Sequence, residues 1–302
     1  MSSPTFAPYQ HSGRFDLSNL VTVFFVAAAV AYPLGYVYAG LNHWITFVVL
    51  RGLVAFGYGF GFGKFGAWLL KCGRVRNEMA ALLAGCCFAL LALYCQWNAF
   101  IHLVVKEAAP PLLSPSALWL LMLDVLDEGT WSFRGVGNVS GILLGLVWLA
   151  EAGIIGCLSA SVPFETISTT PYCETSRCWL DQQRKIDTLE AFTDPAQIAA
   201  LKRADVGPLL QAKPRLPGST NFARITLKHS PECKIFHTLR LDNITTTTDT
   251  EGKVNESATE LLGDLVLPAS MFELITKFEN FGARAPASDG PPPPVPPPPA
   301  QA

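Results

Sequence analysis

Four long apolar segments dominate the first half of this sequence, and they limit its possible folds more than any other feature. They run over Leu17–Leu41, Trp44–Leu70, Met79–Val105 and Val139–Val162. A helix needs roughly 20 apolar residues to cross the ~30 Å hydrocarbon core of a bilayer, and each segment meets that length. The stretch Ala117–Leu126 is too short to span and predicts an amphipathic interfacial helix near 116–127. We therefore predict four transmembrane helices within residues 17–164.

Residues 1–16 form a polar lead before the first segment. A cleaved signal peptide usually has an apolar core of roughly 7–15 residues after a basic region. The apolar stretch here is longer, and apart from His11 the lead carries a single basic residue, Arg14. We therefore expect the first helix to be retained.

The charges of the short loops predict the orientation, because Lys and Arg mark the cytoplasmic side. Lys71, Arg74 and Arg76 follow the second segment, whereas the link 41–43 carries no Lys or Arg. The segment 107–138 is acidic apart from Arg134. We therefore expect both termini in the cytoplasm and the chain in a cell inner membrane.

The second apolar segment is rich in glycine. Gly57 with Gly61, and Gly59 with Gly63, form two overlapping GxxxG pairs. Small residues allow helix backbones to approach closely. We expect these glycines to pack on Ala27, Ala28, Ala29 and Ala31 of the first segment, because the short link makes the two helices antiparallel neighbours. A pore or hinge is the alternative function.

Two ionisable side chains lie deep in the predicted spans. Arg51 lies roughly 9 Å from the outer face and Glu151 roughly 16 Å, at 1.5 Å per helical residue. Such groups are costly in lipid and are functional candidates. We predict an intramembrane Arg51–Glu151 ion pair, with a proton or ion relay as the alternative. Lys64 lies nearer the cytoplasmic end, where its amine can reach the interface.

The second half differs from the first in its residue pattern, and this pattern predicts a small soluble α+β domain with an antiparallel sheet over residues 165–283. Asp194 and Pro195 suit an N-cap and a first helical position. We expect helices at Leu180–Phe192, Ala196–Arg203 and Ala269–Phe281, and strands at Phe222–Lys228, Thr238–Thr247 and Ser257–Val266. Residues 284–302 are almost wholly Pro, Ala and Gly, which predicts a disordered or polyproline II tail.

Four residues of this domain have the spacing of a possible metal site. Cys173 and Cys178 form a C-x4-C pair, and Cys233 and His237 form a C-x3-H pair. Two such pairs brought together build a tetrahedral zinc site, and a reducing cytoplasm favours metal over disulfide. Ser230 occupies the place of a first knuckle cysteine, and serine is a poor zinc ligand. The alternatives are a zinc-ribbon-like fold without metal, or cysteines packed in a small core.

Several short motifs together resemble a group of uncharacterised bacterial multi-pass inner-membrane proteins with a zinc-ribbon-like cytoplasmic domain. They follow the Gly-rich second span and occupy Lys71–Asn77, Gly129–Ser132, Trp148–Ala152 and Pro171–Glu174. The resemblance covers roughly residues 20–280 and implies a Cys-Pro-x-Cys knuckle, from which this sequence departs at Ser230. The resemblance implies no particular activity.

Composition and motifs narrow the range of functions that this chain could have. A net charge of −2 offers no basic face for nucleic acid. The five histidines are dispersed, and we find no nucleophile–base pair or phosphate loop, so we do not expect an enzyme. Interaction or scaffolding through the cytoplasmic domain or the proline-rich tail is our main expectation. A small transporter or channel using Arg51, Lys64 and Glu151 is the alternative. A lipid-acting enzyme using Asp124, Asp127 and Glu128 is a third possibility.

Overall fold

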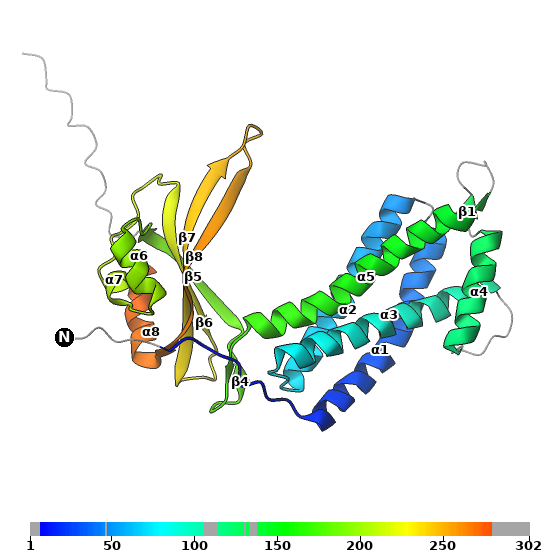
Figure 1. The fold of residues 1–302 in the computed structure, drawn as a ribbon, viewed down its shortest axis with the longest axis horizontal. Helices are drawn as coiled ribbons and strands as arrows, with labels where there is room; N and C mark the ends of the chain where they lie inside the picture. The colour runs from blue at the N-terminus through cyan, green and yellow to red at the C-terminus, as the bar shows by residue number, and fades with distance from the viewer. Residues whose placement is uncertain (1–6, 46, 106–113, 130, 133–137, 280–302) are drawn as a thin grey trace, which may run out of the picture. The chain divides into compact units, whose positions relative to one another are not determined.

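The computed structural model describes residues 7–45, 47–105, 114–129, 131–132 and 138–279. The chain divides into two compact units (Figure 1). Residues 11–170 form a helical unit, and residues 1–10 join residues 171–302 in a second unit. The proline-rich segment 284–302 lies outside the described residues.

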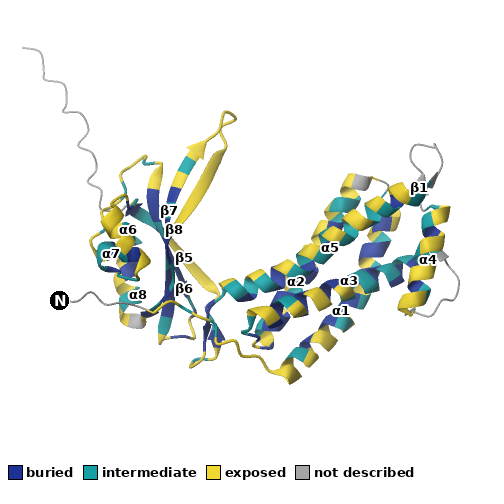
Figure 2. Ribbon diagram, viewed as in Figure 1, coloured by how far each residue is buried: buried dark blue, intermediate teal, exposed yellow. Residues whose placement is uncertain are grey.

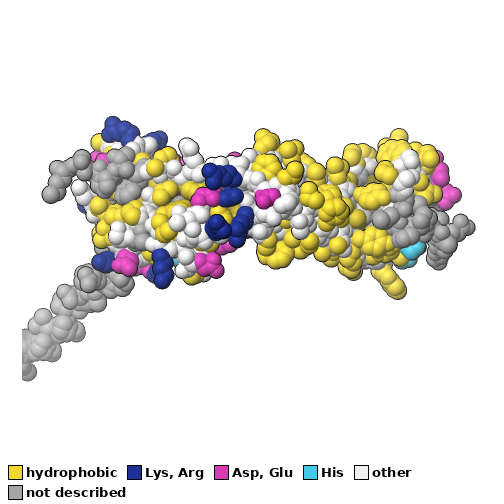
Figure 3. All heavy atoms as spheres, turned by 90° about the horizontal axis from the view of Figure 1, so that it is seen from below, with side chains coloured by type: hydrophobic (Ala, Val, Ile, Leu, Met, Phe, Trp, Pro, Cys, Tyr) yellow, Lys and Arg dark blue, Asp and Glu magenta, His cyan; other side chains and the backbone are white. Residues whose placement is uncertain are grey.

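The helical unit contains the predicted spans. Its helices are α1 (Leu17–Trp44), α2 (Val48–Cys72), α3 (Glu78–Val105), α4 (Pro115–Glu128) and α5 (Gly141–Thr169), with a short hairpin of β1 (Trp131–Ser132) and β2 (Asn138–Val139). Four of these helices, all but α4, are long and apolar enough to cross a membrane. On the face drawn in Figure 3, apolar side chains cover most of the helical unit, and Lys, Arg, Asp and Glu gather largely on the other unit. The prediction of four spans is confirmed, as is a helix near 116–127.

The last span is longer than the sequence pattern predicts. It was expected to end at Val162, but α5 continues through Pro163 to Thr169. The hydroxyl of Thr166 donates to the Val162 carbonyl at 2.7 Å, and that of Thr169 donates to the Glu165 carbonyl at 2.7 Å. The polar side chains after Val162 thus bond within the helix, and they extend it instead of ending it.

Helix α5 packs between α2 and α3, and α1 packs mainly on α3. A Cβ on Gly59 would lie 2.8 Å from the Cα of Ile155. The same atom on Gly57 or Gly61 would meet nothing within 4 Å among the described residues. The four glycines of the two GxxxG pairs therefore divide into a buried pair, Gly59 and Gly63, and an exposed pair, Gly57 and Gly61.

The expected partner of these glycines was wrong. They contact α5, whereas the small residues of α1 are buried against α3, where a Cβ on Gly35 would lie 2.9 Å from the Cys95 carbonyl carbon. Chain adjacency suggested an α1–α2 pairing. The apolar faces of these helices also allow a different arrangement, in which the glycines of α2 contact α5 and Gly35 of α1 contacts α3.

The second unit is an α+β domain with an antiparallel sheet, as predicted. Its strands are β3 (Tyr172–Cys173), β4 (Cys178–Trp179), β5 (Gln182–Glu190), β6 (Asn221–His229), β7 (Phe236–Thr248) and β8 (Val254–Pro268). The four long strands form one sheet in the order β5-β6-β7-β8, and β3 pairs with β4. The helices are α6 (Pro195–Lys202), α7 (Gly207–Leu210) and α8 (Ala269–Thr276). Asp194 caps α6 as predicted, accepting the Ala196 amide at 2.9 Å.

The helix expected at Leu180–Phe192 is wrong, because most of this segment is strand β5. Its Gln-Gln-Arg-Lys run has good helix propensity. Pairing with β6 overrides that propensity, since Ile186 and Leu189 enter the core from β5 on either side of a register shift. The final helix is also shorter than expected, because α8 ends at Thr276.

The core of this unit lies between the sheet and its helices. Leu201 of α6, Leu209 of α7 and Ile275 of α8 are fully buried with the leucines and isoleucines of one sheet face. Helices α6, α7 and α8 lie on the same side of the sheet (Figure 1), and the buried residues follow that layer (Figure 2).

The polar N-terminal lead adds to the sheet, which the sequence did not predict. The amide of Tyr9 donates to the Asp264 carbonyl at 2.7 Å, and the amide of Val266 donates to the Ala7 carbonyl at 3.0 Å. Residues 7–9 therefore cover the outer edge of β8 near Leu265, where Pro8 forms a bridge.

Candidate functional site

Three cysteines far apart in the sequence meet in one buried cluster. Cys173 and Cys178 are opposite one another in the β3–β4 pair, and Cys233 comes from the loop between β6 and β7. All three are buried, together with Leu180, and Phe236 packs on them. The short β3–β4 hairpin and the β6–β7 loop thus act as two knuckles facing one small core.

Burial and hydrogen bonds give the thiols of Cys178 and Cys233 different acidities. The Ser176 amide donates to Cys173 Sγ at 3.4 Å. Burial raises the pKa of the Cys178 thiol, against the effect of a hydrogen bond with Ser230. Burial also opposes ionisation of Cys233, but backbone groups and the side chains of Cys173 and Ser176 stabilise its thiolate and lower its pKa overall. Cys233 is therefore the more acidic of the two.

The structure does not bring His237 to the cysteines, which corrects the predicted ligand set. Successive strand residues point to opposite faces of a sheet. Because Phe236 packs on the cysteines, His237 points the other way, and its ring lies 4.2 Å from the Phe272 ring centroid. The hydrogen bond to Cys178 places Ser230 at the fourth position of the cluster.

This donor set does not fit a structural zinc ion. Serine lacks the easily formed anionic sulfur of cysteine. Within the described ranges, no group of three or more His, Cys, Asp or Glu side chains has an arrangement that could hold a metal. In the structure the three cysteines pack with Leu180 and Phe236 as one small core.

A pair of histidines, which no sequence motif indicated, lies under α8. The rings of His229 and His237 are 6.3 Å apart and both contact Phe272. Each Nδ1 atom is buried and has no hydrogen-bond partner among the described residues. Burial lowers the pKa of both imidazoles, and the nearby charge of Arg184 adds to this effect at His229.

Arg51 and Glu151 of the helical unit belong to one polar cluster with Tyr38. Arg51 donates from Nε to the Ile45 carbonyl at 2.8 Å and from Nη2 to the Asn42 carbonyl at 3.0 Å. The Tyr38 hydroxyl donates to Glu151 Oε2 at 3.5 Å, and the charges of Arg51 and Glu151 attract one another. The guanidinium therefore fastens the turn between α1 and α2.

Two other predicted charged sites are exposed. Lys64 is exposed on α2 with Nζ 5.4 Å from the Phe60 ring centroid. Asp124, Asp127 and Glu128 are exposed on α4.

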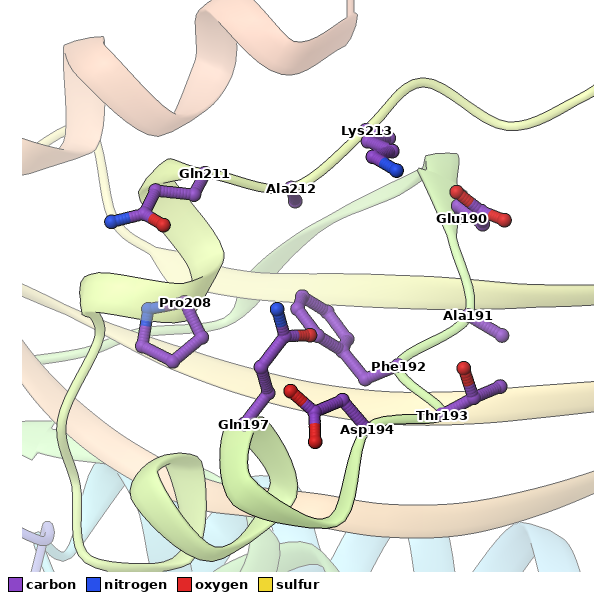
Figure 4. A pocket seen from close by; sticks show the side chains of 10 residues that line it. All are labelled: Glu190, Ala191, Phe192, Thr193, Asp194, Gln197, Pro208, Gln211, Ala212 and Lys213. Atoms are coloured by element: carbon purple, nitrogen blue, oxygen red, sulfur yellow. The ribbon is translucent and has the colours of Figure 1, made fainter.

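A polar hollow of about 250 Å³ lies between the end of β5, the start of α6 and α7 (Figure 4). Glu190, Gln197, Gln211 and Lys213 offer carboxylate, amide and amine groups to it. Asp194 also lines it, but its Oδ1 accepts the Ala196 amide as the helix cap. The remaining groups are exposed, so the hollow offers surface hydrogen bonding without a buried reactive group.

Comparison of the chain with protein-family models, with curated proteins and with solved structures finds no match. The resemblance to bacterial inner-membrane proteins therefore stays a prediction. The function proposed below follows from the contacts and exposed surfaces of the chain itself.

Proposed function

We propose that this chain is a membrane-anchored interaction protein without catalytic activity, and that its β domain binds a partner protein along the free part of β8. The supporting observation is an arm formed by β7 and β8 beyond the rest of the sheet (Figure 1). Strand β6 pairs with β7 only as far as Thr245, whereas β7 and β8 continue to the Thr248–Val254 pair. Every residue from Val254 to Glu260 is exposed.

The outer edge of this arm offers backbone groups to a partner. The Asp249 amide donates to the Lys253 carbonyl at 3.0 Å, and the Thr246 amide donates to the Thr220 carbonyl of the neighbouring segment at 2.8 Å. In an antiparallel pair, successive residues direct their backbone groups alternately toward and away from the partner strand. Because Thr246 directs its amide away from β8, its neighbours two residues along do the same, and Ala258, which pairs with Ile244, directs its amide away from β7. Such an edge binds an extended peptide by strand addition.

The test removes that one donor. Proline is tolerated on an edge strand where its missing N–H faced solvent. Ala258→Pro should therefore keep the β7–β8 ladder but lose proteins that co-purify with the full chain, whereas the control Ala258→Val keeps them. The same set of partners with both variants, or no partner with the wild type, refutes strand addition at this edge.

We propose that the β domain lies in the cytoplasm. Four spans would return the chain to the side on which it began, where Lys71 lies in the last turn of α2 and Arg74 and Arg76 lie in the α2–α3 loop. Cys72 is exposed there and provides the test. A membrane-impermeant maleimide should label wild type only after lysis and Ser116→Cys in intact cells. Labelling of wild type in intact cells contradicts this orientation.

Transport through Arg51 and Glu151 is the second candidate function. Its support is Asn42 Oδ1, which is buried beside Arg51 without a hydrogen-bond partner among the described residues. A tether is better supported, because two guanidinium donors are used on the α1–α2 turn. If Glu151→Gln, with unchanged folding, abolishes a cellular function that the Ala258→Pro variant retains, transport replaces interaction as the proposal.

A further inference from the structure

An apolar groove opens on the lipid-facing side of the helical unit, between α1 and α3. These helices run side by side (Figure 1). The groove has a volume of about 440 Å³ and is lined by apolar side chains, among them Phe15, Val21, Phe24, Leu83 and Ala84. This volume falls within the roughly 300–1,000 Å³ of small-molecule sites. Because both helices are apolar enough to cross a membrane, the groove would lie at the depth of lipid acyl chains.

Basic residues stand at the mouth of this groove. The Arg76 amide donates to the Arg14 carbonyl at 2.9 Å, and Asn77 Nδ2 donates to the Gly13 carbonyl at 3.0 Å. These bonds fasten the segment before α1 to the loop before α3. Arg14 is next to Phe15 of the groove, so the two arginines lie where α1 and α3 begin, at the same end as Arg74.

Carboxylates at this end do not cancel the basic charge. Asp16 and Glu78 stand among Arg14, Lys71, Arg74 and Arg76. Asp16 Oδ1 accepts both the amide and the hydroxyl of Ser18 at 2.8 Å, as the cap of α1. Glu78 lies in the first turn of α3, where the helix dipole favours a carboxylate. The net charge of this group of six residues is positive, which suits an anionic headgroup.

The backbone of Arg74 gives an independent indication. Its φ is +52°, in the left-handed region that favours glycine. It follows the end of α2, where the Val75 amide donates to the Leu70 carbonyl at 3.0 Å, and glycine is the usual residue at such a helix end. Strain of this kind persists where the surrounding structure requires it and often marks a functional site. Here the strained position carries a cation beside the other arginines.

We propose that the groove between α1 and α3 binds one anionic phospholipid, with an acyl chain against Phe24 and Leu83 and the phosphate at Arg14, Arg74 and Arg76. Apolar lining alone would accept any lipid chain. The arginines at the mouth select the negative headgroup, because each basic residue near a lipid phosphate contributes attraction that falls off within a Debye length. This site is independent of partner binding by the β domain.

The full chain, purified in detergent, is incubated with phosphatidylglycerol or with phosphatidylcholine carrying identical acyl chains, and bound lipid is counted by native mass spectrometry. Wild type should retain phosphatidylglycerol preferentially. Each arginine removed should lower that preference by roughly fivefold, and added salt should weaken it. Arg74→Gly is the sharpest variant, because it removes the charge at a position where glycine relieves strain, so the fold is kept.

Arg177→Gly is the matched control, since Arg177 has a φ of +53° in the β3–β4 turn of the other unit. It should leave lipid retention unchanged. Ala84→Leu fills the groove and should lower retention of both lipids, whereas Ala29→Leu on an exposed face of α1 should not. Equal retention of the two lipids by wild type overturns the proposal. A dimer in place of the lipid adduct also overturns it, because a second copy would then cover the groove.

Discussion

The carbonyl oxygen of Leu158 lies 2.7 Å from the point that a Cβ on Gly63 would occupy. No side chain fits at that distance, so α2 and α5 touch backbone to backbone. On the next turn toward the α2 N-terminus, the hydroxyl of Ser159 donates to the Gly59 carbonyl at 3.3 Å across the same interface. This contact joins the second and last spans and makes α5 the central helix of the unit.

Gly63→Ala should destabilise the helical unit, because the added methyl must push α2 from α5, and overpacking typically costs about 1–3 kcal/mol. Gly61→Ala is the control on the same helix, since its methyl meets nothing within 4 Å among the described residues. Thermal unfolding of the two variants in one detergent measures the difference. Equal melting temperatures would show that the close approach is not needed for stability.

Ser230→Cys should create a zinc site. The substitution supplies a fourth thiol beside Cys178, and four cysteines on two knuckles are a common structural zinc set. The variant should carry about one zinc per chain, because structural zinc is bound nearly stoichiometrically, and wild type less than about a tenth. Elemental analysis of both purified proteins measures the zinc content of each. Stoichiometric zinc in wild type would mean that the three native cysteines suffice.

Acid should loosen the helix that covers the histidine pair. Burial lowers the pKa of His229 and His237, so the unfolded chain binds more protons than the folded chain as pH falls below about 6.5. The stability contributed by the neutral rings is therefore complete above that pH and decreases as pH falls toward the lowered folded values. Hydrogen exchange of α8, corrected for intrinsic rates, should be faster at low pH.

The substitution His237→Phe keeps an aromatic ring against Phe272 and removes the titrating group. Its α8 exchange should depend less on pH than that of wild type. Arg184, which is paired with Glu279, is present in both proteins. Its charge therefore does not contribute to the difference between the variant and the wild type. An unchanged pH dependence in this variant would assign the acid sensitivity to another group.

Arg51→Gln should destabilise the α1–α2 turn. The carbonyls of Asn42 and Ile45 would lose their guanidinium donors, and an unpaired buried polar group costs about 1–3 kcal/mol. Lys64→Gln is the control, since Lys64 is exposed on the same helix. Thermal unfolding compares the two. If Arg51→Gln unfolds at the wild-type temperature, the arginine does not act as a tether.

Part of the candidate site could be predicted from the sequence. Spacing grouped Cys173 and Cys178 and pointed to Ser230 as a departure from a knuckle. Spacing also suggested His237, wrongly, because the alternation of β7 turns it to the opposite face from Phe236. The histidine pair had no such signal, since its members come from different strands and meet only through the sheet and α8.

The length and hydrophobicity of its apolar segments determined four spans in this chain, because a membrane-crossing helix satisfies its own backbone and needs no partner to be recognised. The alternating and β-branched residues of β6, β7 and β8 likewise determined most strands of the sheet. Only the tertiary structure decided that α5 meets Gly59 and Gly63, that residues 182–190 form a strand, and that residues 7–9 cover the edge of β8. These outcomes depend on which surfaces meet, and several partners satisfy the same local pattern until packing and backbone pairing select one.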